Sequence, residues 1–85
     1  MKQYRLLIDL DVVRDFDLLP KRKRLRLLNH LDRIRESPDR LSDFSEDDAS
    51  GRRLEVSVVE GFAVHYWIDF ADRHVKILAF YSADR

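Results

Sequence analysis

Residues 51–81 read GRRLEVSVVEGFAVHYWIDFADRHVKILAFY and contain three strand patterns in succession. Each pattern has a period of two with apolar residues along one side, and the first alternates strictly between apolar and polar, as expected for a strand with one buried face. Glu60-Gly61 separates the first two patterns, and glycine supplies the positive φ that a tight hairpin turn needs. Residues 71–73 separate the second pattern from the third. We therefore expect a three-stranded antiparallel meander.

One face of this meander is predicted to be strongly apolar. The side chains expected to point inward are Leu54, Val56 and Val58 in the first strand, Phe62, Val64, Tyr66, Ile68 and Phe70 in the second, and Val75, Ile77, Ala79 and Tyr81 in the third. Because an isolated meander is marginally stable in water, another layer must cover this face.

The N-terminal half is predicted to supply that layer. Residues 4–10 alternate like a fourth strand, residues 11–18 form a short helix capped by Asp11, and residues 21–37 form a longer helix stopped by Pro38. The apolar arc of the longer helix consists of Leu25, Leu28, Leu31 and Ile34, flanked by Leu27. Residues 39–50 are predicted to form an acidic loop, pinned to the core by Leu41 and Phe44. The predicted fold class is α+β, with an N-terminal strand and a helical hairpin packed on the C-terminal three-stranded antiparallel meander.

Composition narrows the possible functions. A chain of 85 residues is expected to be one domain, spanning residues 1–85. It has no cysteine, which excludes disulfides and thiolate chemistry and fits a cytoplasmic protein. Its formal net charge is zero, so wholesale attraction to nucleic acid is not expected. Charges near the start argue against a signal peptide, and no apolar run reaches the roughly 20 residues of a membrane-spanning helix.

The longer helix is predicted to carry a line of arginines, Arg22, Arg26 and Arg33, on the side opposite its apolar arc. Basic residues also begin this helix, where the helix dipole is already positive. Such a surface suits phosphates or the acidic side chains of a partner. A solvated helix face, with its charge offset by the acidic loop, explains the same pattern.

A second candidate surface is the polar side of the meander. His65 and Trp67 are expected to share this side with Arg53 and Ser57, an arrangement suited to contact RNA through proton transfer or base stacking. An ordinary amphipathic sheet face is the competing interpretation. Asp69 and Asp72 are interpreted as turn residues. The three histidines lack metal-ligand spacing and there is no glycine-rich phosphate loop, so neither a metal nor a cofactor is predicted.

The order of these elements resembles the RelE/ParE family of bacterial toxins over essentially the whole chain. LLPKRKRLRLLNHLDRIRESP is similar to the family's second helix, which commonly follows Leu-Pro and ends at proline. GRRLEVSVVEGFAVHYWID resembles its charged strand, tight turn and aromatic strand, and HVKILAFYSADR stands where its last strand and tail are expected.

The resemblance implies the toxin of a type II toxin–antitoxin system, neutralised by a cognate antitoxin protein and without membrane association. RelE-like members cut messenger RNA in the ribosome, whereas ParE-like members inhibit DNA gyrase. Carried to this sequence, the first activity implies Arg53, His65, Tyr81 and Arg85 as catalytic residues and Arg22, Arg26, Arg33 and Trp67 as contacts to RNA or antitoxin.

The sequence also departs from the family's pattern. Glu55 reverses the charge expected near Arg53, Ala63 replaces a frequent arginine, and Ser82-Ala83-Asp84-Arg85 replaces a basic pair after the last strand. A carboxylate beside a phosphate that gains charge raises the barrier to cleavage, so we expect a slow, ribosome-dependent nuclease. A non-catalytic gyrase inhibitor and an inactive homologue that serves as an antitoxin-binding module stay open as alternatives.

Overall fold

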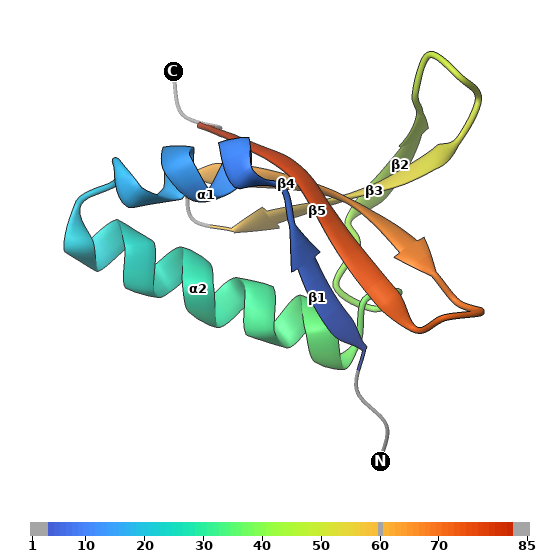
Figure 1. Cartoon of the computed structure of the whole chain (residues 1–85), viewed down its shortest axis with the longest axis horizontal. Helices are drawn as coiled ribbons and strands as arrows, with labels where there is room; N and C mark the ends of the chain where they lie inside the picture. Colours follow the sequence, from blue (N-terminus) through green and yellow to red (C-terminus); the bar gives the residue numbers. More distant parts are fainter. Residues whose placement is uncertain (1–3, 60, 83–85) are drawn as a thin grey trace.

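The computed structural model describes residues 4–59 and 61–82, in which two helices cover one face of a five-stranded sheet (Figure 1). The elements are β1 (Arg5–Ile8), α1 (Leu10–Asp17), α2 (Lys21–Glu36), β2 (Phe44–Asp47), β3 (Arg53–Val59), β4 (Phe62–Asp69) and β5 (His74–Ser82). The strands lie in the order β1-β5-β4-β3-β2. β1 runs parallel to β5, and the other neighbours are antiparallel. The predicted α+β class and meander are therefore confirmed. None of the helices in the described ranges is long and apolar enough to cross a membrane.

The predicted loop at residues 39–50 contains a strand, β2, which pairs with β3 at the edge of the sheet. Its sequence, FSED, is acidic and short, which suits an edge strand but gives no apolar signal. Leu41 packs against the core as expected. Phe44 does not, because it lies opposite Val56 on the face without helices and is 51% exposed.

The predicted orientation of the β3 side chains is wrong, because the residues expected to point toward the helices point away from them. Glu55 lies opposite Tyr66 and Ser57 lies opposite Val64, and both partners belong to the core under the helices. Residues 54, 56 and 58 therefore lie on the other side, which we call the uncovered face. The hairpin turn fixes this register, because Gly61 adopts φ 86° and residues 59 and 62 pair directly across it.

A β-bulge in β5 reverses the predicted faces of its second half. His65 pairs with Ala79, but the next residue of β4, Tyr66, pairs with Ile77, so Leu78 is an extra residue. An extra residue in one strand shifts every later side chain to the opposite face. Ala79 and Tyr81 therefore lie on the uncovered face, whereas Phe80 packs against the core.

Helix α2 is rotated relative to the predicted arc. Leu27, His30, Leu31 and Ile34 are buried, whereas Leu25 and Leu28 are 52% and 47% exposed. The short helix α1 begins after Asp9 and contributes Val12 and Phe16 to the same core, so the prediction of Asp11 as its N-cap is wrong. The helices thus cover β1, β5 and β4, with the last turns of α2 reaching β3 through His30 and Ser57.

Candidate functional site

Two of the predicted catalytic residues meet on the uncovered face. His65 on β4 and Tyr81 on β5 lie edge to face, with ring centroids 5.1 Å apart and an interplanar angle of 85°. The β5 bulge makes this contact possible, since without the extra residue Tyr81 would point toward the helices. An imidazole beside a phenol can accept a proton on one ring and donate one from the other.

The surroundings of this pair are apolar. The neighbouring β3 side chains on the same face are Leu54, Val56 and Val58, and Ala63 precedes His65 on β4. Lys76 also lies on this face, but its ammonium group is 3.6 Å from the Asp9 carboxylate. Within the described ranges, β3 thus offers the His65–Tyr81 pair no cation that could hold a phosphate.

Arg53 does not join the pair. It shares the helix-side face of β3 with Glu55, and its Nε donates to the Glu55 carboxylate at 2.9 Å and to Ser45 Oγ at 3.1 Å. The prediction that Arg53 and Ser57 share a face with His65 and Trp67 is therefore wrong. The register of β3 places Arg53 and Ser57 on the side of the helices. The position of Glu55 beside Arg53, inferred from the sequence, is confirmed by this ion pair.

Trp67 lies on the uncovered face, partly buried, with the guanidinium of Arg52 5.3 Å from the centre of its ring. The contact between Arg52 and Trp67 was not predicted. Arg52 immediately precedes β3, and its long side chain reaches Trp67 on the neighbouring strand β4. Arg85, the fourth predicted catalytic residue, lies outside the described residues.

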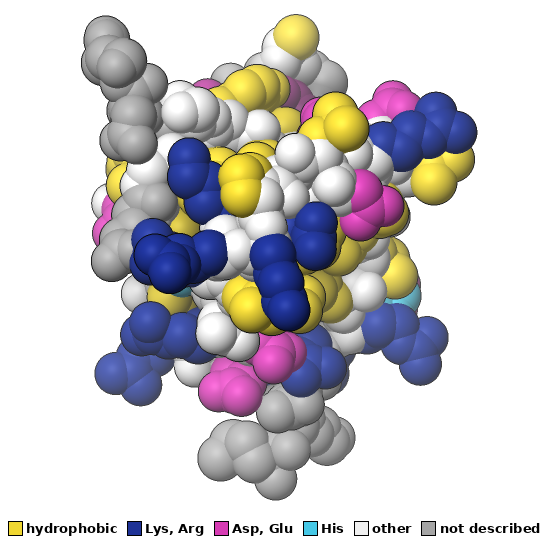
Figure 2. Space-filling model, turned by 90° about the vertical axis from the view of Figure 1, so that its left-hand side faces the viewer, with side chains coloured by type: hydrophobic (Ala, Val, Ile, Leu, Met, Phe, Trp, Pro, Cys, Tyr) yellow, Lys and Arg dark blue, Asp and Glu magenta, His cyan; other side chains and the backbone are white. Residues whose placement is uncertain are grey.

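The predicted arginine line on α2 is exposed. Figure 2 views the molecule from the end where α1 runs into α2, and Lys and Arg side chains gather there among apolar ones. Two shallow depressions follow the helix, the first lined by Lys21, Arg22, Leu25, Arg26 and Asn29, and the second by Arg26, Asn29, His30, Arg33 and Val59. This surface combines positive charge with the exposed Leu25 side chain.

An apolar groove that the sequence did not reveal lies between α1, α2 and β5. Its volume is about 210 Å³, and it is lined by Ile8, Val12, Val13, Phe16, Asp17, Leu28, Leu31 and Phe80. Leu28 forms its rim on α2, which explains why this residue follows the apolar period and yet is half exposed. The sequence hinted at this groove because α2 carries more leucines than a single buried face of the helix can accommodate.

A buried polar contact joins α2 to β3. His30 Nε2 and Ser57 Oγ are 2.7 Å apart, and the two residues are 6% and 1% exposed. Burial, assisted by the charge of Arg33, lowers the pKa of His30, while Asp43 opposes the shift. The imidazole is therefore neutral at physiological pH, and this pair ties the helix to the sheet.

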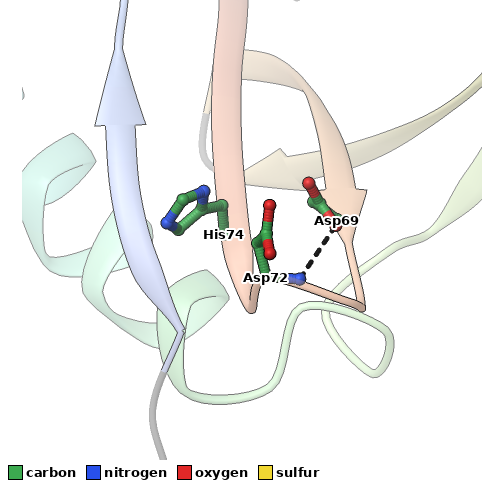
Figure 3. A group of neighbouring side chains, drawn as sticks. All are labelled: Asp69, Asp72 and His74. Atoms are coloured by element: carbon green, nitrogen blue, oxygen red, sulfur yellow. Dashed lines mark hydrogen bonds between the residues drawn. The ribbon is translucent and has the colours of Figure 1, made fainter.

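Asp69, Asp72 and His74 gather at the turn from β4 to β5, with one donor atom of each within 4.8 Å of the others (Figure 3). Carboxylate and imidazole groups are ligands of divalent metals. Asp69 also has a structural role, since its Oδ1 accepts a hydrogen bond of 3.1 Å from the Asp72 backbone N–H. That bond agrees with the interpretation of the two aspartates as turn residues.

Comparison of the sequence with family models and with curated protein sequences finds no match. Solved structures do match. RelE in the archaeal RelE-RelB complex from Pyrococcus horikoshii OT3 is 24% identical, with a TM-score of 0.80 over 99% of this chain and 99% of that chain. The RelBE2 toxin-antitoxin complex from Mycobacterium tuberculosis gives 18% identity and a TM-score of 0.82 over 95% and 99%. The isolated E. coli RelE toxin is 18% identical, with a TM-score of 0.77 over 96% of this chain and 86% of that chain. The chain therefore has the RelE toxin fold.

Proposed function

We propose that this chain is the toxin of a toxin–antitoxin pair and that it inhibits translation. The observation that carries the proposal is the likeness to RelE along almost the whole chain, including RelE chains solved together with RelB antitoxins. The chain itself offers a surface suited to such a partner. The apolar groove between α1, α2 and β5 and the exposed arginines both involve α2, so an amphipathic segment with acidic side chains fits both.

The proposed activity is ribosome-dependent cleavage of messenger RNA. Cleavage of RNA through its own 2′-hydroxyl requires a base for that hydroxyl, a positive charge at the phosphate and a proton donor for the leaving 5′-oxygen. We assign the first proton transfer to His65 and the second to Tyr81, and the contact between their rings supports treating them as one site. The side chains of β3 beside the pair form an apolar strip, so we infer that the positive charge at the phosphate comes from elsewhere, the ribosome foremost. We expect slow cleavage on the ribosome and none on free RNA.

The same strip favours a second candidate function without catalysis. With Leu54, Val56 and Val58 beside His65, and Arg53 turned to the other side, the chain is also suited to act by binding alone. It would then be a gyrase inhibitor or an inactive homologue that retains antitoxin binding.

Induced expression in bacteria, with mapping of transcript ends and of plasmid supercoiling, separates these functions. We expect growth arrest and new transcript ends within translated regions, both lost in a His65→Ala, Tyr81→Phe double variant and retained in the control His74→Ala. Arrest that persists in the double variant together with relaxed plasmids would assign the protein to gyrase inhibition. Absence of arrest by the natural chain, with antitoxin binding intact, would make it a binding module.

The antitoxin surface has a separate test. A triple variant carrying Arg22→Glu, Arg26→Glu and Arg33→Glu should bind the protein encoded by the neighbouring gene more slowly and with a weaker dependence on salt, because charged rims mainly set association rates. A double variant carrying Arg5→Glu and Arg52→Glu, neither of which lines a depression along α2, is the control. Binding that is indifferent to both the triple change and salt would rule out the α2 face as the docking site.

A further inference from the structure

The sheet splits at one end, and a cleft opens in the split. β3 pairs with β4 only from Glu55 and Tyr66 onward, although β3 begins at Arg53 and β4 continues to Asp69. Beyond this point β3 pairs only with β2 and β4 only with β5, and the two hairpins diverge (Figure 1). A cavity of about 270 Å³ lies between them, lined by Asp39, Arg53, Glu55, Trp67, Ile68 and Phe70.

One wall of the cleft is built around a buried carboxylate. Glu55 is only 9% exposed, and its carboxylate accepts hydrogen bonds from Ser42 at 2.6 Å, Ser45 at 2.8 Å and Arg53 at 2.9 Å. Burial alone would raise the pKa of Glu55, but these hydrogen bonds and the charge of Arg53 together lower it. The wall is therefore ionised and held in place, and Arg53 compensates its charge.

The uncompensated charge in the cleft is that of Asp39. Within the described ranges its carboxylate makes no hydrogen bond or ion pair, and it is exposed. Trp67 and Phe70 contribute aromatic side chains to the lining of the same cavity. A carboxylate and aromatic rings that line one cavity can together hold a guanidinium group, which pairs with the first and stacks on the second. The chain already shows this affinity, since Arg52 lies over the Trp67 ring.

Charge around the cleft selects against nucleic acid. The segment that carries one wall also contains Asp43, Glu46, Asp47 and Asp48. A polyanion approaching this end meets like charge, whereas a basic polypeptide is attracted. We propose that the cleft binds an arginine side chain of a partner polypeptide, with its guanidinium group between the Asp39 carboxylate and the Trp67 ring. This site is distinct from the α2 face and does not depend on the proposed function.

The chain carries its own probe, because Trp67 is its single tryptophan. The whole protein is titrated with Nα-acetyl-arginine amide, and binding is followed by Trp67 fluorescence and by ¹H–¹⁵N spectra. The matched ligand is Nα-acetyl-citrulline amide, which has the same shape without the charge. We expect saturable binding of the arginine compound, in the millimolar range for so small a ligand, with shifted signals confined to residues around the cleft.

Asp39→Asn should weaken this binding by roughly fivefold, as expected for one partly exposed ion pair. Glu46→Gln is the control, because it removes the same charge from β2 without lining the cleft. Equal binding of the citrulline compound, or equal weakening in the two variants, would overturn the proposal. The proposal would also be overturned if guanosine monophosphate shifted the same signals at a lower concentration than the arginine compound, since the cleft would then be a nucleotide site.

Discussion

Leu27 and Leu28 are adjacent leucines on α2 with opposite environments, and they provide a matched test of how the helix packs. Leu27 is 0% exposed in the core, whereas Leu28 is 47% exposed at the rim of the apolar groove. Truncation of a fully buried leucine to alanine removes transfer free energy and leaves a cavity, which together cost about 2–5 kcal/mol. At Leu28 no closed cavity forms and only about half of the transfer term is lost, so the cost should stay below about 1.5 kcal/mol.

These costs are large relative to the stability of a small domain, which is on the order of 5–10 kcal/mol. For a chain of this size each kcal/mol lowers the melting temperature by about 4–8 °C, so Leu27→Ala should melt at least about 8 °C below the natural protein. Calorimetry or denaturant unfolding of the two variants, side by side, measures the difference. Equal losses, or a larger loss in Leu28→Ala, would show that α2 packs through the arc expected from its leucine period and would refute the packing described here.

Three further predictions concern polar groups. Tyr66→Phe removes a buried hydroxyl that donates to the Pro38 carbonyl at 2.5 Å, and it should lower the free energy of unfolding by about 1–2 kcal/mol in denaturant titrations. The pKa of His30 is lowered in the folded state, so protonation of this residue favours unfolding. The free energy of unfolding should fall as pH drops below about 6.5, and it should fall less steeply in His30→Gln. The same dependence on pH in both proteins would contradict this. Hydrogen bonds lower the pKa of Asp48 to about 2, so its contribution to stability is present above about pH 4 and is lost as pH falls toward 2. Over that pH range the difference in melting temperature between Asp48→Asn and the natural protein should vanish.

The positions of the main elements follow from the sequence because each depends on a local signal. Alternation over residues 53–59 and 62–69 matches β3 and β4, and the proline at each end matches the limits of α2. β2 was missed because Phe44 is its single apolar side chain, so the segment shows no alternation of apolar and polar residues. Only pairing with β3 makes this segment a strand, and pairing is not a local property.

The composition of the candidate site was harder to predict, since it depends on which face each strand presents. The alternation in β3 pointed to the wrong face, because its apolar residues, Leu54, Val56 and Val58, lie on the uncovered face and Ser57 points toward the helices. The register across Gly61 decides this, and the bulge at Leu78 decides where Tyr81 points. His65 and Tyr81 were predicted together from the family resemblance, whereas Arg53 was misplaced because it follows the register of β3 and lies on the face of Glu55 and Ser57.

The parallel pairing of β1 with β5 has a consequence for synthesis of the chain. Arg5 lies opposite His74, so the first strand made has no neighbour in the sheet until the last strand has left the ribosome. Contacts between such distant segments form late and slowly. Until then the strand-facing sides of α1 and α2 lack the strand that completes their core, which leaves apolar surface of the nascent chain uncovered. A protein with this topology can complete its sheet only after β5 has been translated.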